Sequence, residues 1–219
     1  MIFKIVEMKT ALIVGATGLV GKSLLDLLLQ SNEYDKVIVL RRQTLSLPAK
    51  AEVIITDYKT LQNNSDKLSA YDVFCCLGTT IRKARTKEAF KQVDFDYPLA
   101  LAKITLDKGA KHFLLVSALG ANAKSAIFYN KVKGEIEQEI AALGFESFSI
   151  IRPSLLLGER SEQRAGEDAA KLFYKIFGLL IPKKYKGIEA KQVAKAMLLI
   201  ANYKKSGKRI FESDELQNF

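Results

Sequence analysis

Three observations predict an α/β fold with a doubly wound, mainly parallel sheet. The run ALIV at 11–14 is short and apolar, as in parallel strands that are covered on both faces. Gly15, Gly18 and Gly21 follow it at spacing G-x-x-G-x-x-G and lead into an amphipathic helix. Further short apolar runs then alternate with helical patterns along the chain, which is typical of a parallel sheet with helices on both faces.

The glycine turn at 15–21 has the properties of an anion-binding site. Glycines let the backbone turn sharply and let a diphosphate approach the main chain, where free N–H groups and the positive end of a helix dipole hold it. Residues 16–23 also nearly fit the phosphate loop of nucleoside triphosphatases, with Ala16 in place of its first glycine. A strand–helix turn without a ligand is a third interpretation. The glycine spacing alone does not decide among them.

The composition is that of a single globular domain. The chain has 219 residues, of which 48% are hydrophobic and 26% charged, enough to bury a sizeable core. We expect one domain over 1–219, with a core at 8–153 and a small C-terminal substrate-side segment at 154–219. No apolar run approaches the roughly 18–20 residues that cross a bilayer, and the first residues make a poor signal peptide.

Charge and cysteine content bear on partners and location. The formal net charge of +10 favours anionic ligands, although solvated surface lysines are the simpler explanation. The sequence has no nucleic-acid-binding motif and no metal-ligand spacing, so we expect neither a specific nucleic-acid partner nor a metal. Cys75 and Cys76 are neighbours, which makes a disulfide between them unexpected. We therefore expect a reducing, cytoplasmic location.

The second and third predicted strands indicate which cofactor the turn would bind. The apolar run at 36–40 ends in Arg41 and Arg42, and residues 38–50 contain no acid. In folds that prefer NAD an acid near this point binds the adenosine ribose, whereas arginine binds a 2′-phosphate. Asp57 follows the third predicted strand, at a position that commonly lies beside the adenine. The pattern predicts NADP(H) rather than NAD(H); two solvent-exposed arginines are the alternative.

The fourth predicted strand, at 71–77, runs into Gly78 and Thr79. Ligands of open α/β sheets lie at the carboxyl ends of strands, so we expect this turn to line the same crevice as the glycine turn. A triphosphatase would need a magnesium-binding acid at this end of the strand. Asp72 instead lies at its start, which counts against the phosphate-loop interpretation.

Ser117, Tyr129 and Lys133 have the arrangement of a hydride-transfer site. Ser117 follows the predicted strand at 112–116, and Tyr129 and Lys133 lie one turn apart on a helix predicted at 126–143. Tyrosine can deliver a proton to a carbonyl oxygen, and a nearby ammonium lowers its pKa from about 10 toward the working range. A serine hydroxyl can donate to the same oxygen, and the lysine can also hold the nicotinamide ribose.

Together these motifs resemble the short-chain dehydrogenase/reductase superfamily, in its extended or atypical branch. Residues 74–80 (FCCLGTT), 116–122 (VSALGAN), 129–135 and 152–158 (RPSLLLG) are similar to the small oxidoreductases related to the human HIV Tat-interacting protein, over about 8–215. The resemblance implies a Rossmann fold and catalysis by Tyr129 and Lys133. The residues that it places at NADP(H) are Gly15, Thr17, Gly18, Leu19, Val20, Arg41, Arg42, Leu77, Gly78 and Pro153.

The chain departs from the superfamily pattern in two places. Val93-Asp94 stands where many members have Val-Asn, and residues 77–79 replace Asn-Ala-Gly. We expect an NADP(H)-dependent oxidoreductase that acts on a small carbonyl or alcohol, as a monomer or homodimer; an NADPH-binding regulatory protein with little turnover is the alternative. Residues 158–189 are expected to form the substrate-side segment, before a helix at 189–203 and a short strand from Arg209.

Overall fold

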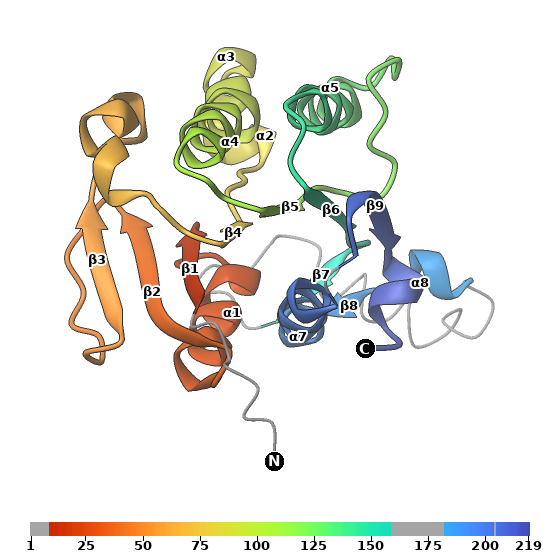
Figure 1. Ribbon diagram of the computed structural model, residues 1–219. Coiled ribbons are helices and arrows are strands. Elements are labelled where there is room, and N and C mark those ends of the chain that lie inside the picture. The colour runs from red at the N-terminus through yellow and green to blue at the C-terminus, as the bar shows by residue number, and fades with distance from the viewer. Residues whose placement is uncertain (1–8, 159–181, 204) are drawn as a thin grey trace.

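The fold centres on a seven-stranded parallel sheet with the order β3-β2-β1-β4-β5-β6-β9 (Figure 1). The computed structural model describes residues 9–158, 182–203 and 205–219. The strands are β1 (Lys9–Val14), β2 (Tyr34–Arg41), β3 (Ala51–Ile55), β4 (Asp72–Cys75), β5 (His112–Val116), β6 (Ser147–Arg152) and β9 (Gly207–Glu212). β7 (Leu156–Leu157) and β8 (Ile188–Glu189) form a separate parallel pair. The chain reverses its direction across the sheet between β1 and β4, which is where ligands of such folds bind.

Helices cover both faces of the sheet (Figure 1). α1 (Leu19–Gln30) and α7 (Ala190–Asn202) pack against each other on one face. α4 (Tyr97–Asp107) and α5 (Phe128–Ala142) lie on the opposite face. The shorter elements are the 3-10 helices η1 (Tyr58–Lys67) and η3 (Lys183–Tyr185), the π-helical turn η2 (Gln92–Asp96), α2 (Ile81–Ala84), α3 (Lys87–Lys91) and α8 (Ser213–Leu216). This arrangement confirms the predicted α/β fold with a doubly wound parallel sheet.

The core consists of two apolar clusters, one on each face of the sheet. Successive strand residues point to opposite faces, so β1 supplies both. Ala11 and Ile13 belong to the cluster under α1 and α7, and Leu12 and Val14 to the cluster under α4 and α5. All four are fully buried, which explains why β1 is a continuous apolar run rather than an alternating one.

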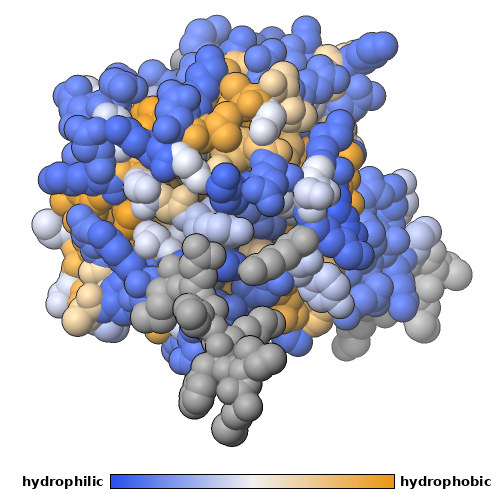
Figure 2. Space-filling model, in the orientation of Figure 1, coloured by the Kyte–Doolittle hydropathy of each residue, from blue (hydrophilic) through white to orange (hydrophobic). Residues whose placement is uncertain are grey.

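Figure 2 shows hydrophilic residues over most of this face, with apolar residues in separate groups, one of them in the upper half, where Figure 1 shows helices above the sheet. No helix in the described ranges is long and apolar enough to span a bilayer.

Residues 87–107 form three consecutive elements, α3, η2 and α4. Thr86 caps α3, and its hydroxyl accepts the N–H of Ala89 at 3.1 Å. Pro98 lies in the first turn of α4 and has no N–H to donate to the carbonyl of Asp94, four residues earlier. The chain passes through a π-helical turn at this point, and that turn contains Asp94.

Other expectations for the ends of the chain are met in part. The helix predicted at 189–203 is α7, and the last strand begins at Gly207. Most of the expected substrate-side segment falls on residues 159–181, which lie outside the described part of the chain. Residues 1–7, which precede the first strand, also lie outside it.

The glycine turn joins β1, α1 and β4 at very short range. Gly15 has a left-handed backbone (φ 81°), and a Cβ atom there would lie 2.4 Å from the carbonyl oxygen of Cys76. A Cβ at Gly21 would lie 2.2 Å from the carbonyl oxygen of Gly15. Glycine at 15 and 21 therefore allows the first helix to start directly against the end of β4.

Gly15 and Gly144 offer a matched test of this packing. Both have a left-handed backbone, with φ of 81° and 83°, but a Cβ at Gly144 would meet no atom within 4 Å. Gly144→Ala should cost about 1–2 kcal/mol of unfolding free energy from backbone strain alone. Gly15→Ala should cost about 2 kcal/mol more, because β1 and β4 must separate. Urea unfolding of both variants measures the difference; equal losses would contradict the close approach.

Candidate functional site

The glycine turn presents exposed backbone at the carboxyl end of β1. Gly18 is the N-cap of α1 and has no side chain with which to cap it; its own N–H donates to the carbonyl of Gly15 at 3.0 Å. Thr17 and Gly18 are exposed, and Leu19 is half-buried. The first N–H groups of a helix lack partners within the helix, and its dipole is positive at this end. The turn therefore presents the free N–H groups and the positive dipole end that favour an anion.

Two arginines end the neighbouring strand. Arg41 is the last residue of β2 and is half-buried, and Arg42 is exposed. The buried Nε of Arg41 has no hydrogen-bond partner within the described ranges. A buried guanidinium nitrogen without a partner is costly, so the observation fits a site that receives an anionic group.

The 3-10 helix η1 covers the side of β2 next to these arginines. The hydroxyl of Tyr58 donates to the carbonyl of Leu40 at 3.3 Å. Burial raises the pKa of Tyr58 to about 12, against the opposing charges of Arg42 and Arg41. Asp57 is exposed and caps η1 by accepting the N–H of Lys59 at 3.2 Å. Asp57 therefore has a structural role in addition to the adenine contact that the sequence predicts.

The turn after β4 lies against the glycine turn, as the sequence predicts. The N–H of Cys76 donates to the carbonyl of Val14 at 2.9 Å, and its carbonyl is the group that Gly15 approaches. Leu77 is buried, Gly78 is exposed and Thr79 is half-buried. The carboxyl ends of the first and fourth strands therefore lie side by side, where ligands of this fold bind.

Lys133 reaches this crevice from α5. The residue is only 4% exposed, and its ammonium lies 2.8 Å from Oδ1 of Asp94. A Cβ at Gly78 would be 3.8 Å from Nζ of Lys133 and 3.5 Å from Oδ1 of Asp94, so the pair lies against the turn after β4. Burial opposes the charge of Lys133, but the carboxylate of Asp94 and the phenol of Tyr129 favour it, and the pKa of the ammonium is raised.

Tyr129 lies one turn before Lys133 on α5 and is half-buried. Its ring packs against the fully buried ring of Phe90, with centroids 5.5 Å apart. Phe90 comes from α3 and also contacts Phe128. The aromatic contact fixes the side of α5 on which the phenol lies, and that is the side of Lys133.

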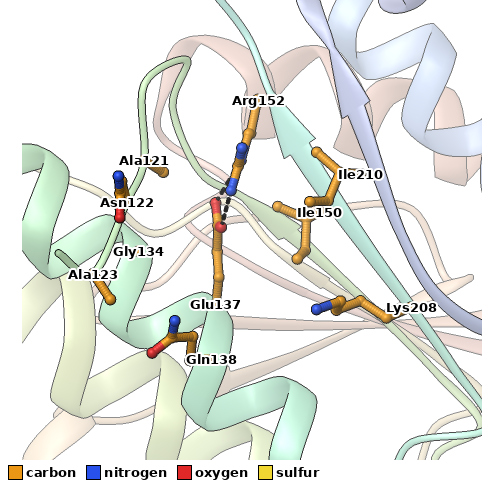
Figure 3. Close-up of a pocket in the computed structure, with 10 residues that line it drawn as sticks. All are labelled: Ala121, Asn122, Ala123, Gly134, Glu137, Gln138, Ile150, Arg152, Lys208 and Ile210. Carbon is orange, nitrogen blue, oxygen red and sulfur yellow. Dashed lines mark hydrogen bonds and ion pairs between the residues drawn. The ribbon is translucent and has the colours of Figure 1, made fainter. Parts of the chain in front are cut away.

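Ser117 has a different neighbour from the one expected. Its hydroxyl donates to Oε1 of Glu137 at 2.5 Å, and the side chain is buried. Nε and Nη2 of Arg152 donate to the two oxygens of Glu137, at 3.0 and 2.5 Å, and this hydrogen bonding raises the pKa of Arg152 (Figure 3). The hydroxyl hydrogen of Ser117 is thus taken by Glu137, so its role as a donor to substrate stays a prediction.

The Glu137–Arg152 pair borders a cavity of about 310 Å³ between α5, β6 and β9 (Figure 3). Lys208 of β9 and Gln138 of α5 also line it. On the crevice side, Pro153 follows β6 and is buried, and its carbonyl accepts the N–H of Leu119 from the loop after β5. The turn predicted to pass near the nicotinamide is therefore tied to the loop that precedes Tyr129.

Sequence reasoning missed two residues of this site, Asp94 and Glu137. In the sequence, Asp94 stands out only as a departure from the superfamily pattern. Its contact with Lys133 depends on the π-helical turn. Glu137 could have been found, because 129, 133 and 137 are four residues apart and share one face of α5.

A second buried polar cluster lies at the opposite edge of the sheet. Asp72 is fully buried and accepts the hydroxyl of Tyr34 at 2.8 Å, with Nδ1 of His112 at 3.5 Å and Nζ of Lys9 at 3.7 Å. Each is the first residue of its strand, so the cluster lies far from the carboxyl ends that form the crevice. In the described part of the chain, no group of three or more His, Cys, Asp or Glu side chains is placed to hold a metal.

The comparisons with known proteins bear directly on this site. Residues 11–176 match the NAD dependent epimerase/dehydratase family. The chain belongs to this family. Protein HTATIP2 of Rattus norvegicus is 39% identical over 171 residues, which is 76% of this chain and 70% of that protein. Protein FMP52, mitochondrial, of Eremothecium gossypii is 36% identical and covers 94% of this chain and 95% of its own. The resemblance inferred from the motifs is confirmed.

Solved structures of other proteins share the fold of this chain. A structure titled MoeE5 in complex with UDP-glucose and NAD has a TM-score of 0.70 at 17% identity, over 94% of this chain and 79% of that one. The UDP-glucose 4-epimerase of Thermotoga maritima has a TM-score of 0.69 at 18% identity, over 95% and 80%. At these identities the likeness establishes the fold alone, and it confirms the Rossmann architecture.

Family membership also decides between the interpretations of the glycine turn. The phosphate-loop interpretation needs Lys22 and Ser23 for a triphosphate and its metal. Lys22 is exposed, and the hydroxyl of Ser23 donates to the carbonyl of Leu19 at 3.3 Å, one turn back in α1. Family membership and these two observations count against the phosphate-loop interpretation.

The expected cytoplasmic location is wrong on these comparisons. Relatives from Eremothecium gossypii and Emericella nidulans carry the word mitochondrial in their names. Two adjacent, mostly buried thiols argue only against a disulfide between them. They carry no information about the compartment in which a reduced protein resides.

Breaking the buried Glu137–Arg152 pair should cost much more unfolding free energy than breaking an exposed ion pair. Arg152→Met leaves the Glu137 carboxylate buried without its cation and should cost about 3–5 kcal/mol of unfolding free energy. Adding Glu137→Gln should recover part of the loss, because no unpaired charge then stays buried. Lys36→Met, which breaks the exposed Lys36–Glu52 pair, should cost about 1 kcal/mol or less. Urea unfolding measures the unfolding free energy of each variant. Equal losses for Arg152→Met and Lys36→Met would contradict the expected cost of the unpaired Glu137 carboxylate.

Proposed function

We propose that this protein is an NADP(H)-dependent oxidoreductase of the short-chain dehydrogenase/reductase type that acts on a small carbonyl or alcohol. The observation that carries the proposal is the position of Lys133. Its ammonium is buried one turn beyond Tyr129 and against the turn after β4. That turn adjoins the glycine turn, so the phenol and the ammonium face the crevice in which this fold binds its nucleotide.

The residues along the crevice fit NADP(H) from one end to the other. The backbone of residues 15–20 would hold the diphosphate, and Arg41 and Arg42 would meet the 2′-phosphate. The unpartnered Nε of Arg41 supports this assignment, since a phosphate accepts bidentate hydrogen bonds from a guanidinium. Asp57 would lie near the adenine. Leu77, Gly78, Thr79 and Pro153 would border the nicotinamide half, with Lys133 holding its ribose.

In the reductive direction the bound cofactor supplies a hydride to the substrate carbon. Tyr129 gives its phenol proton to the carbonyl oxygen that gains negative charge, and the resulting phenolate takes a proton from solvent afterwards. Lys133 favours the phenolate by its charge. Phe90 excludes water from one side of the ring, which strengthens the electrostatic effect of the ammonium.

A regulatory protein that binds NADPH with little turnover is the second candidate. One observation favours it. Glu137 takes the hydroxyl hydrogen of Ser117, so this hydroxyl is not free to donate to a substrate oxygen.

The proposal is tested by NADPH oxidation across a panel of small aldehydes and ketones, for the wild type and Tyr129→Phe. The wild type should reduce at least one compound. Tyr129→Phe should lower kcat by about 10²–10⁴-fold, because the proton donor is lost, with the dissociation constant for NADPH unchanged. Tyr203→Phe, at an exposed tyrosine after α7, is the matched control and should match the wild type.

Binding of both cofactors, measured on the same proteins, separates the candidates. NADPH should bind more tightly than NADH; equal affinities would contradict the role of the arginines. Tight NADPH binding without turnover in any variant would favour the regulatory protein. Turnover that Tyr129→Phe leaves intact would remove the phenol from the mechanism.

A further inference from the structure

Asp94 joins three elements of the crevice through one carboxylate. Oδ1 lies 2.8 Å from Nζ of Lys133 on α5, and Oδ2 accepts the N–H of Thr79, at 2.8 Å, from the turn after β4. The side chain itself belongs to η2 and is 1% exposed. A buried carboxylate is stable only when its oxygens are paired, and here both oxygens have partners that belong to the proposed site.

The π-helical turn explains why Asp94 can reach both partners. η2 lies between α3 and α4, next to Pro98, and contacts α5. A π-helical turn widens the helix by one residue and changes the direction of the side chains that follow it. Asp94 thereby points inward, whereas Asp96, two residues later on the same turn, is exposed.

The buried charges around Tyr129 and Lys133 are one cation and one anion. The groups that act on Lys133 are the carboxylate of Asp94 from η2, the phenol of Tyr129 from α5 and the thiol of Cys75 from β4. Burial raises the pKa of Cys75 to about 12, so the thiol is neutral at physiological pH. From α3 the uncharged ring of Phe90 packs on Tyr129, and the ammonium of Lys87 lies 5.4 Å from the ring centre of Phe128. One buried cation and one buried anion therefore share the site.

We propose that Asp94 is a positioning residue that fixes Lys133 against the turn after β4 and, by offsetting its charge, opposes the effect of the Lys133 ammonium on the Tyr129 phenol. The proposal rests on the proposed function for its catalytic meaning. A lone ammonium beside a phenol stabilises the phenolate, and a carboxylate on the same ammonium opposes this effect. The phenol form is the one that gives a proton to a carbonyl oxygen. Alcohol oxidation needs the phenolate and should therefore be favoured only at alkaline pH.

The direct test is the pKa of Tyr129 in the protein without substrate. Tyrosinate absorbance is followed during a pH titration, and the signal of Tyr129 is the difference between each protein and its Tyr129→Phe counterpart. Asp94→Asn removes the charge and keeps the shape. It should lower the pKa of Tyr129 by about one to two units, because the ammonium is then uncompensated. Asp96→Asn, on the same turn but exposed, should leave the pKa of Tyr129 where it is in the wild type.

A second variant keeps the proposal testable if Asp94→Asn folds poorly. Asp94→Asn combined with Lys133→Met replaces the ion pair by a neutral pair, and the pKa of Tyr129 should return to within about half a unit of the wild type. A Tyr129 pKa in Asp94→Asn equal to that of the wild type would overturn the proposal. So would a double variant whose Tyr129 pKa falls as far as that of Asp94→Asn.

Activity measurements separate this proposal from the proposed function. Where the wild type oxidises an alcohol, its rate should rise with pH, and in Asp94→Asn this rise should move to lower pH by the same amount as the pKa of Tyr129. A shifted Tyr129 pKa in Asp94→Asn without turnover in any variant would support the charge offset by Asp94 and contradict the oxidoreductase function. Turnover with an unshifted Tyr129 pKa would support the oxidoreductase function and contradict the role of Asp94.

Discussion

The buried contact between Lys133 and Asp94 holds the candidate site together. The two side chains come from α5 and η2, and the second oxygen of Asp94 binds the turn after β4. Breaking a buried pair by removing one partner typically costs about 3–5 kcal/mol, which is a large fraction of the stability of a domain of this size. The ion pair therefore ties the turn after β4 to α5, and the close contact of Gly15 with Cys76 ties the same turn to the glycine turn.

These two constraints act on the same sheet edge. The glycine turn presents backbone N–H groups at the carboxyl end of β1, and the ion pair places Lys133 beside the carboxyl end of β4. Between them lies the point where the strand order reverses. A long anionic ligand with a reactive ring at one end suits such a crevice, since one end offers dipoles and arginines and the other a phenol with its ammonium. The polar cluster around Asp72 lies at the opposite end of the strands.

Much of this could be predicted from the sequence, because the decisive signals are local. The run at 11–14, the glycine spacing and the four-residue step from Tyr129 to Lys133 each depend on neighbours along the chain. Contacts between distant segments were harder to predict. Ser117 was correctly placed at the end of a strand, but nothing local indicates that Glu137 takes its hydrogen. Asp94 lies in a segment with helical periodicity throughout, and only the position of Pro98 hints at the π-helical turn that aims it at Lys133. No short sequence pattern indicated the cellular compartment of the protein.

The central claim is that one crevice binds a dinucleotide along the glycine turn and presents its ring to Tyr129. A crystal structure of the protein with NADPH tests it most directly. We expect the diphosphate on the backbone of residues 15–20, the 2′-phosphate at Arg41 and Arg42, and the nicotinamide within contact of the Tyr129 hydroxyl. A cofactor bound elsewhere, or a nicotinamide on the far side of the turn after β4 from Tyr129, would contradict the account.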